Sequence, residues 1–130
     1  MSYGHSKKVK ISYDEAIIKI KESLKKEGFG VITEIDVRDN LKQKLNVDYE
    51  NYIILGACNP SLAYKALQCE KEIGLLLPCN VIVYSTNGET VISLINPIEA
   101  MKVVDNPKLK DIAILVDKKL KKVMGGLWNG

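Results

Sequence analysis

The dipeptide Asn87-Gly88 stands between two runs that are rich in β-branched residues, 80–86 and 89–95. A two-residue turn between antiparallel strands requires positive φ at both of its positions, and Asn and Gly tolerate this better than other residues. We therefore predict a β-hairpin here. A sheet that contains this hairpin must be antiparallel in at least one part.

Three other dipeptides predict where helices begin. Asn59-Pro60, Asn96-Pro97 and Asn106-Pro107 share one arrangement. The Asn side chain caps the helix, and the proline takes the first helical position, where its missing N–H costs nothing. A fourth helix is predicted to begin at Ser12, because Glu15 completes a capping box with it.

The remaining elements follow from the spacing of the apolar residues. The expected strands are 7–12, 29–37 and 51–58, and the expected helices include 12–28, which ends at Gly28, as well as 39–45 and 107–124. In the strand at 29–37, strict alternation places Phe29, Val31, Thr33, Ile35 and Val37 on one face and Gly30, Ile32, Glu34 and Asp36 on the other. The strand at 51–58 is apolar on both faces, so we expect it to lie centrally in the sheet.

The predicted order of elements is β-α-β-(α)-β-α-β-β-α-α. One mainly antiparallel sheet with helices packed on one face is the economical arrangement for this order, so the chain is predicted to be a single α+β domain. Residues 1–6 are expected to form a flexible N-terminal tail, and residues 7–130 the domain.

Charge and composition narrow the choice of partners. The 130 residues carry a net charge of +3, from 19 basic and 16 acidic residues, which is too small to indicate nucleic acid or an anionic membrane. Arg38 is the only arginine, so bidentate recognition of phosphates or bases is almost unavailable. No segment resembles a signal peptide or a membrane span. Three cysteines without CxxC spacing do not indicate a disulfide framework, and we expect a cytoplasmic protein with reduced thiols.

Cys58 is the leading candidate for chemistry. The segment Gly56-Ala57-Cys58-Asn59-Pro60 places this thiol at the end of a strand, directly before a helix. The unpaired N–H groups and the dipole at a helix N-terminus favour a thiolate, which would suit a nucleophilic, redox or ligand-binding cysteine. The alternative is that Cys58 is a small buried hydrophobe, since free cysteine is among the most buried residue types.

Cys79 lies at the start of the next predicted strand, after Pro78. Two thiols at strand–loop junctions could converge on one site that binds a soft metal, carries a persulfide or forms a reversible disulfide. Two sulfurs do not complete a zinc site, and His5 is expected in the tail, so we predict no structural zinc. Cys69 is expected on the polar side of its helix.

Glu34 and Asp36 form a second candidate pair. They lie two residues apart on one predicted strand, so both carboxylates project from the same face. Such a pair can bind a cation or act as acid and base. The alternative is that these carboxylates lie on a solvated edge of the sheet, or that they are partners for nearby lysines.

Three segments resemble the motifs of a known family. The first is Gly28-Phe29-Gly30-Val31 followed by residues 33–37, and the second is residues 55–60 with Ala63 and Leu67 downstream. The third is residues 76–81, and Asn96-Pro97 after the hairpin matches a helix start of the same family. Together they resemble the domain-of-unknown-function family numbered 302 over nearly the whole chain. The resemblance implies a fold of the TATA-binding-protein type, with a curved antiparallel sheet, helices on one side and usually a homodimer. It implies neither DNA binding nor a particular activity.

The leading hypothesis is a small-ligand or metal-binding module with thiol, sulfur or redox chemistry at Cys58. The alternative is a non-catalytic homodimer whose sheet surface binds a partner protein. The candidate ligand-binding residues are Cys58, Asn59, Pro60, Cys79, Glu34 and Asp36. The sequence contains no P-loop, GxGxxG, GxSxG or HExxH motif, so it assigns no enzyme class and indicates no cofactor.

Overall fold

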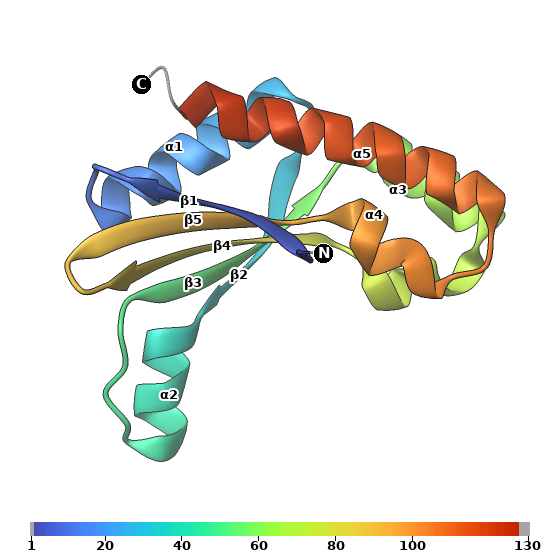
Figure 1. The fold of residues 1–130 in the computed structure, drawn as a ribbon. Helices are drawn as coiled ribbons and strands as arrows, with labels where there is room; N and C mark the ends of the chain where they lie inside the picture. The colour runs from blue at the N-terminus through green and yellow to red at the C-terminus, as the bar shows by residue number, and fades with distance from the viewer. Residues whose placement is uncertain (1, 128–130) are drawn as a thin grey trace.

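The computed structural model describes residues 2–127, which form one five-stranded sheet and the helices that surround it (Figure 1). The strands are β1 (Gly4–Val9), β2 (Gly30–Asp36), β3 (Tyr52–Cys58), β4 (Cys79–Thr86) and β5 (Glu89–Ile95). The helices are α1 (Tyr13–Lys26), α2 (Val37–Leu45), α3 (Pro60–Cys69), α4 (Pro97–Ala100) and α5 (Pro107–Gly126), with the 3₁₀ helices η1 (Lys71–Leu76) and η2 (Met101–Val103). This order confirms the predicted α+β class.

The sheet has the strand order β1-β5-β4-β3-β2, and every neighbouring pair is antiparallel. The hairpin predicted from Asn87-Gly88 joins β4 to β5, with φ of 50° at Asn87 and 77° at Gly88. Strand β3 lies inside the sheet between β2 and β4, as its apolar character on both faces predicted.

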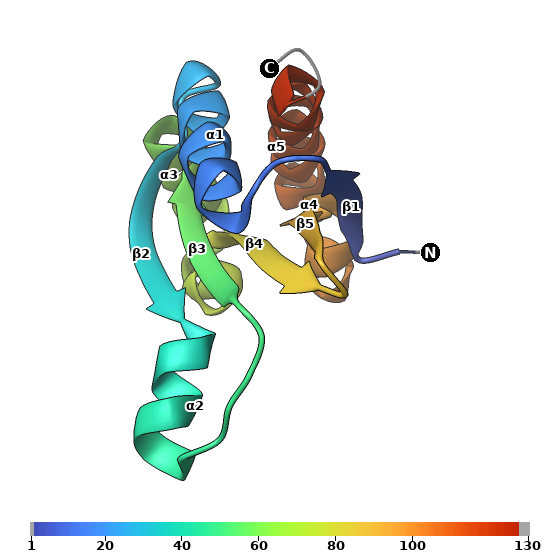
Figure 2. The ribbon, with the colours of Figure 1, turned by 90° about the vertical axis from the view of Figure 1, so that its left-hand side faces the viewer.

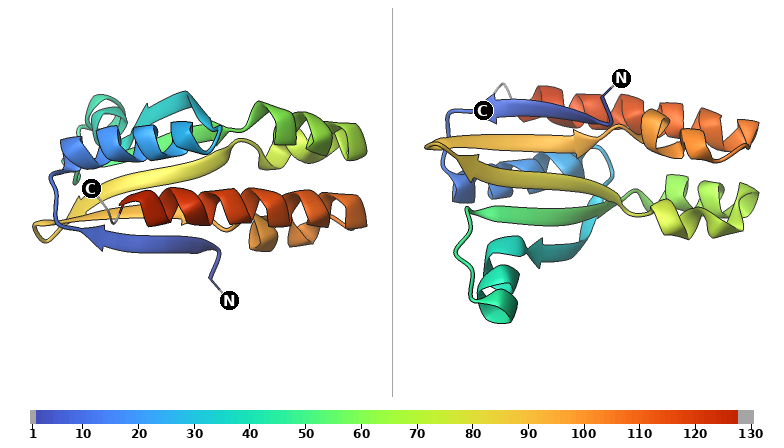
Figure 3. Two further views of the ribbon diagram at one scale, coloured as in Figure 1. Left: turned by 90° about the horizontal axis from the view of Figure 1, so that it is seen from above. Right: turned by 60° about the horizontal axis from the view of Figure 1, so that its bottom comes forward.

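Helices α1 and α5 lie side by side over one face of the sheet (Figure 2), and the view from above shows both running roughly along the strands (Figure 3). Their apolar stripes meet the inward side chains of the central strands in one core. Its fully buried members include Ile20 and Leu24 from α1, Leu120 and Val123 from α5, and Leu55, Val81 and Ile92 from the sheet. Burial of each large aliphatic side chain contributes roughly 1.5–3 kcal/mol, so this layer is the main source of stability.

The predicted caps hold the ends of these helices. Ser12 accepts a hydrogen bond from the backbone N–H of Glu15 at 3.1 Å, which confirms the N-terminus of α1. The helix ends at Lys26, and Gly28 follows with φ of 83°, a conformation that favours glycine. No helix within residues 2–127 is long and apolar enough to cross a bilayer.

The first strand differs from its prediction. Strand β1 spans Gly4–Val9 and not 7–12, so residues 4–6 of the expected tail pair with β5. The free edge of β5 offers backbone partners along its whole length, and this pairing sets the limits of β1 where the apolar pattern is weak. Met1 of the expected tail and the domain's residues 128–130 lie outside the described residues.

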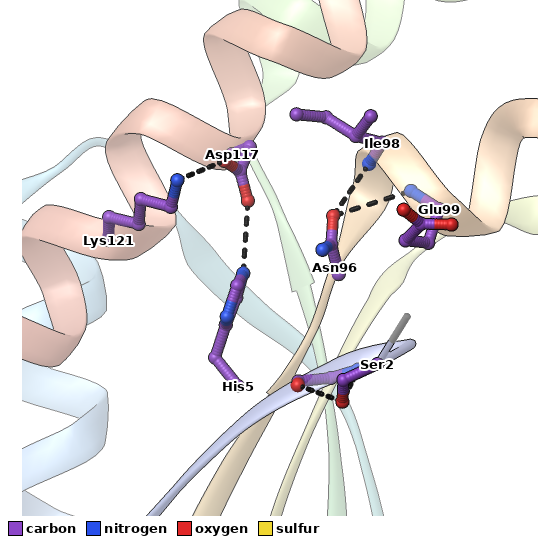
Figure 4. Close-up of polar contacts among 8 residues, drawn as sticks. Ser2, His5, Asn96, Ile98, Glu99, Asp117 and Lys121 are labelled. Carbon is purple, nitrogen blue, oxygen red and sulfur yellow. Dashed lines mark hydrogen bonds and ion pairs between the residues drawn. The ribbon is translucent and has the colours of Figure 1, made fainter.

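His5 is consequently part of the sheet and not of a tail. Its Nε2 lies 3.2 Å from Oδ1 of Asp117, a residue of α5 whose side chain is only 5% exposed. Lys121 Nζ approaches the other carboxylate oxygen at 3.1 Å (Figure 4). The buried carboxylate therefore has a partner on each side, and it connects the edge strand to the long helix.

The alternation predicted for β2 is wrong beyond Val31, because a β-bulge shifts the register between Val31 and Thr33. Val31 pairs with Ala57, and Thr33 pairs with the next residue of β3, Gly56. Consecutive residues of β3 face opposite sides, so Val31 and Thr33 do too. Glu34 pairs with the fully buried Leu55 and therefore belongs to the helix-covered face of the sheet.

Helix α2 projects from the end of β2, away from α1 and α5 (Figure 1), and has no buried residue. Asp36 caps it by accepting a hydrogen bond from the backbone N–H of Asp39 at 3.0 Å. Ile35 and Leu45, on and beside this projection, are 47% and 66% exposed.

Candidate functional site

Cys58 is the last residue of β3 and is half-buried. The next residue, Asn59, caps α3, since its side-chain oxygen accepts a hydrogen bond from the backbone N–H of Leu62 at 3.2 Å. Pro60 takes the first helical position, as predicted. The thiol therefore stands at the junction of a central strand and a helix, in the place that the sequence indicated.

An apolar cavity of about 230 Å³ opens beside this junction, and both Cys58 and Cys79 line it. We refer to it as the thiol cavity. Its other walls are Phe29, Ile32, Ala57, Asn59, Leu62, Ala63, Ala66, Leu67, Leu77, Pro78, Met101, Ile112 and Val116. No wall residue is charged, and Asn59 is the only polar one besides the two thiols.

Cys79 is the first residue of β4 and is 9% exposed. Burial raises the pKa of its thiol to about 11, and the nearby Cys58 adds to this increase. A thiol with such a pKa stays protonated at neutral pH, and only the thiolate attacks electrophiles or binds metals. Cys79 is therefore unreactive at neutral pH, and it contributes shape and a weak S–H donor to the cavity.

The strand register explains how the two thiols approach each other. Cys79 pairs with Ala57, and Cys58 is the next residue along β3, paired on its other side with Gly30. The thiols are therefore on neighbouring strands but are not directly opposed. Among the described residues, no group of three or more His, Cys, Asp or Glu side chains is placed to hold a metal ion.

Gly56 permits close packing at this end of the sheet, because it has no side chain. A Cβ atom at Gly56 would collide with Oγ1 of Thr33 and would lie 2.7 Å from Cγ of Pro78. Thr33 comes from the β2 bulge, and Pro78 lines the thiol cavity after a cis peptide bond with Leu77. The absence of a side chain at Gly56 lets these two neighbours close over β3.

The other predicted candidates are not brought to the cavity. Glu34 forms an ion pair with Lys21 of α1 at 3.0 Å, and Asp36 is engaged as the cap of α2. Cys69, at the end of α3, donates to the backbone oxygen of Ala66 at 3.4 Å and does not line the cavity. The structure thus assigns local structural contacts to both carboxylates and to this third cysteine.

A larger, open hollow of about 1280 Å³ lies at the other end of the sheet. Its lining mixes charges of both signs, and several pair locally, such as Lys8 with Glu89 at 3.2 Å and Arg38 with Asn51 at 2.7 Å. In this hollow the pKa of Tyr13 is raised to about 12, mainly by burial and then by the negative charges of Asp36 and Asp14. The positive charge of Arg38 partly offsets this increase in pKa. Cysteine thiols line the apolar cavity and not this hollow, so we take the thiol cavity as the candidate site.

Some cavity residues could not be read as site residues from the sequence. Ile32 reaches the cavity from the β2 bulge, and Met101 and Ile112 come from η2 and α5, far along the chain. Their apolar character predicted burial but not which surface they would share. The only local signal was the strand–Cys–Asn–Pro junction itself.

The comparisons with known proteins agree with one another. A family model described as a domain of unknown function, DUF302, matches residues 5–127. The chain is also similar to the crystal structure of an uncharacterized conserved DUF302 protein from Bacillus stearothermophilus, with 32% identity and a TM-score of 0.91. That alignment covers 98% of this chain and 99% of the other. No curated protein matches. From the family match and this structural likeness, the chain belongs to the DUF302 family of domains of unknown function.

Proposed function

We propose that this chain is a small-ligand-binding module whose site is the thiol cavity, with Cys58 as its reactive position. The observation that carries the proposal is an apolar cavity of about 230 Å³ with a half-buried thiol in its wall. Apolar cavities of roughly 150 Å³ already bind molecules of the size of benzene, so the space is sufficient for a small ligand.

The lining favours uncharged, largely apolar ligands. A carboxylate or an ammonium group placed there would lose its hydration without gaining a charged partner, which is costly. A metal ion receives less support, because burial keeps the Cys79 thiol protonated and metal binding requires the thiolate. Of the ligand types open to the sequence, a small organic molecule therefore fits best.

Titration with 1-hexanol and, separately, with hexanoate tests this proposal. The two probes share a chain length and differ in the charge of one end. We expect hexanol to raise the melting temperature in proportion to its binding, and hexanoate to bind more weakly by at least about a hundredfold, since it must desolvate a charge. Equal effects of the two probes, or none from either, would contradict the proposal.

A second candidate function is a homodimeric protein-interaction domain. It is supported by α2, which has no buried residue, and by the exposed apolar side chains of Ile35, Leu45, Val47 and Tyr49 on and beside it. Unpaired apolar side chains gathered on one projection are typical of an association surface. Light scattering across a range of concentrations distinguishes the cases, since a monomer at high concentration would remove this candidate.

A further inference from the structure

A second cavity of about 240 Å³ adjoins the thiol cavity. We refer to it as the adjoining cavity. The two cavities share the wall residues Leu77, Pro78, Cys79 and Met101. We infer that they are two lobes of one site for an uncharged, unbranched aliphatic molecule, which threads past Cys79 from one lobe into the other. This inference rests on the proposed function and specifies its ligand class.

The partition between the lobes combines the rigid ring of Pro78 with one adaptable side chain, Met101. Met101 is 7% exposed and lies at the start of η2, between the cavities. Methionine has an unbranched side chain with several rotatable bonds and adjusts readily to irregular space. A change of its rotamer can open this partition without moving the backbone. Cys79 contributes only a small neutral thiol to the partition.

The two lobes share the absence of charged lining residues. Each also has one asparagine, Asn59 in the thiol cavity and Asn80 in the adjoining cavity. The asparagine of one lobe can therefore form a hydrogen bond with a polar end group of the ligand, while apolar atoms surround the ligand's aliphatic part. This pattern suits a long, thin molecule with a neutral polar end and does not suit a compact polar one.

Each lobe is lined by at least one exposed apolar side chain. Ile32 and Leu67 line the thiol cavity and are 61% and 44% exposed, and Leu75 lines the adjoining cavity and is 83% exposed. Each of these side chains loses water contact if an aliphatic chain extends past it. Exposed apolar side chains in both lobes are typical of a surface that an apolar ligand covers.

The test is a titration with unbranched primary alcohols from butanol to dodecanol, using the full chain and two variants. Ala63 lines only the thiol cavity and Ala100 only the adjoining cavity, and both are half-buried positions on helices. Ala63→Leu is expected to weaken all the alcohols about tenfold or more, because it fills the lobe that every alcohol uses. Ala100→Leu is expected to leave butanol unchanged and to weaken the longer alcohols only.

In the unsubstituted chain, affinity should rise about two- to fourfold with each added methylene until both lobes are filled. The NMR signal of the Ala100 methyl group, which lines only the adjoining cavity, should shift with the longer alcohols and not with butanol, while the methyl group of Met124, which lines neither cavity, should not shift. Two results would overturn the two-lobe site and leave the proposed function standing. One is that short alcohols bind and longer alcohols bind no more tightly. The other is that the Ala100→Leu variant binds alcohols of every length as tightly as the unsubstituted chain does. Binding of no alcohol would overturn both.

Discussion

Replacing Gly56 by alanine is expected to lower the free energy of unfolding by about 3 kcal/mol, because the new Cβ has no space. It would collide with the Thr33 side chain and lie 2.7 Å from the ring of Pro78. The proline ring is rigid, so relief requires that β2 or the segment before β4 move. Since Pro78 also lines the thiol cavity, the same change should distort the site. The loss of stability is measured by urea denaturation, in which the midpoint should fall while the m-value stays constant.

Gly30 supplies the matched control for this substitution. It is also a strand glycine, it pairs with Cys58, and nothing lies within 4 Å of the position that its Cβ would take. Gly30→Ala is therefore expected to change the stability by no more than about 0.5 kcal/mol. If Gly56→Ala were as harmless as Gly30→Ala, the close packing of Thr33 and Pro78 over β3 would be wrong.

Raising the pH from 9 to 11 is expected to cost this fold about 2 kcal/mol through Cys79 alone. Burial raises the pKa of this thiol from 9.0 to about 11. In that interval the unfolded chain has lost the proton and the folded chain still holds it. The contribution of this thiol to stability is therefore fully present below pH 9 and is lost as the pH rises through 11.

A comparison of variants isolates this effect, because other groups such as Tyr13 also titrate at high pH. Cys79→Ala should unfold with a shallower dependence on pH over the interval 9 to 11 than the unsubstituted chain, as measured by urea denaturation. Cys58→Ala retains the buried thiol and should keep most of the steep dependence. Parallel curves for the unsubstituted chain and Cys79→Ala would show that this thiol is not buried as described.

The parts of the fold that were predictable from the sequence depend on local geometry. The hairpin at Asn87-Gly88 and the caps at Ser12 and Asn59 are set by backbone conformation and hydrogen bonds within a few residues. Such interactions form wherever the residues occur, so the pattern alone determines them. The resulting order of elements was sufficient to predict an antiparallel sheet covered by helices.

The errors arose where a contact between distant residues decided the structure. Strict alternation was wrong in β2 because Thr33 is set opposite Gly56, 23 residues further along the sequence. His5 was expected in a tail, but β5 and Asp117 hold it in place. In both cases the deciding partner belongs to another element, and the periodicity of one segment contains no information about it.

The candidate site shows the same division. The thiol of Cys58 at a strand–helix junction was predictable, and the pairing of β3 with β4 brings Cys79 to it. Glu34 and Asp36 matched a pattern that is common at functional sites, and in the structure Glu34 pairs with Lys21 while Asp36 caps α2. The cavity itself depends on Met101 and on residues of α5, so only the assembled fold defines it.

The most direct test of the ligand cavity is the rate at which Cys58 is alkylated by a small uncharged reagent, followed by peptide mass spectrometry. Cys69 serves as the internal control, because it is half-buried but lies outside the cavity. A bound alcohol occupies the space in front of Cys58, so saturating 1-hexanol should slow its alkylation while hexanoate at the same concentration does not, and Cys69 should be unaffected by either. An unchanged rate at Cys58 in the presence of saturating hexanol, or equal slowing at Cys69, would contradict a ligand site in the thiol cavity.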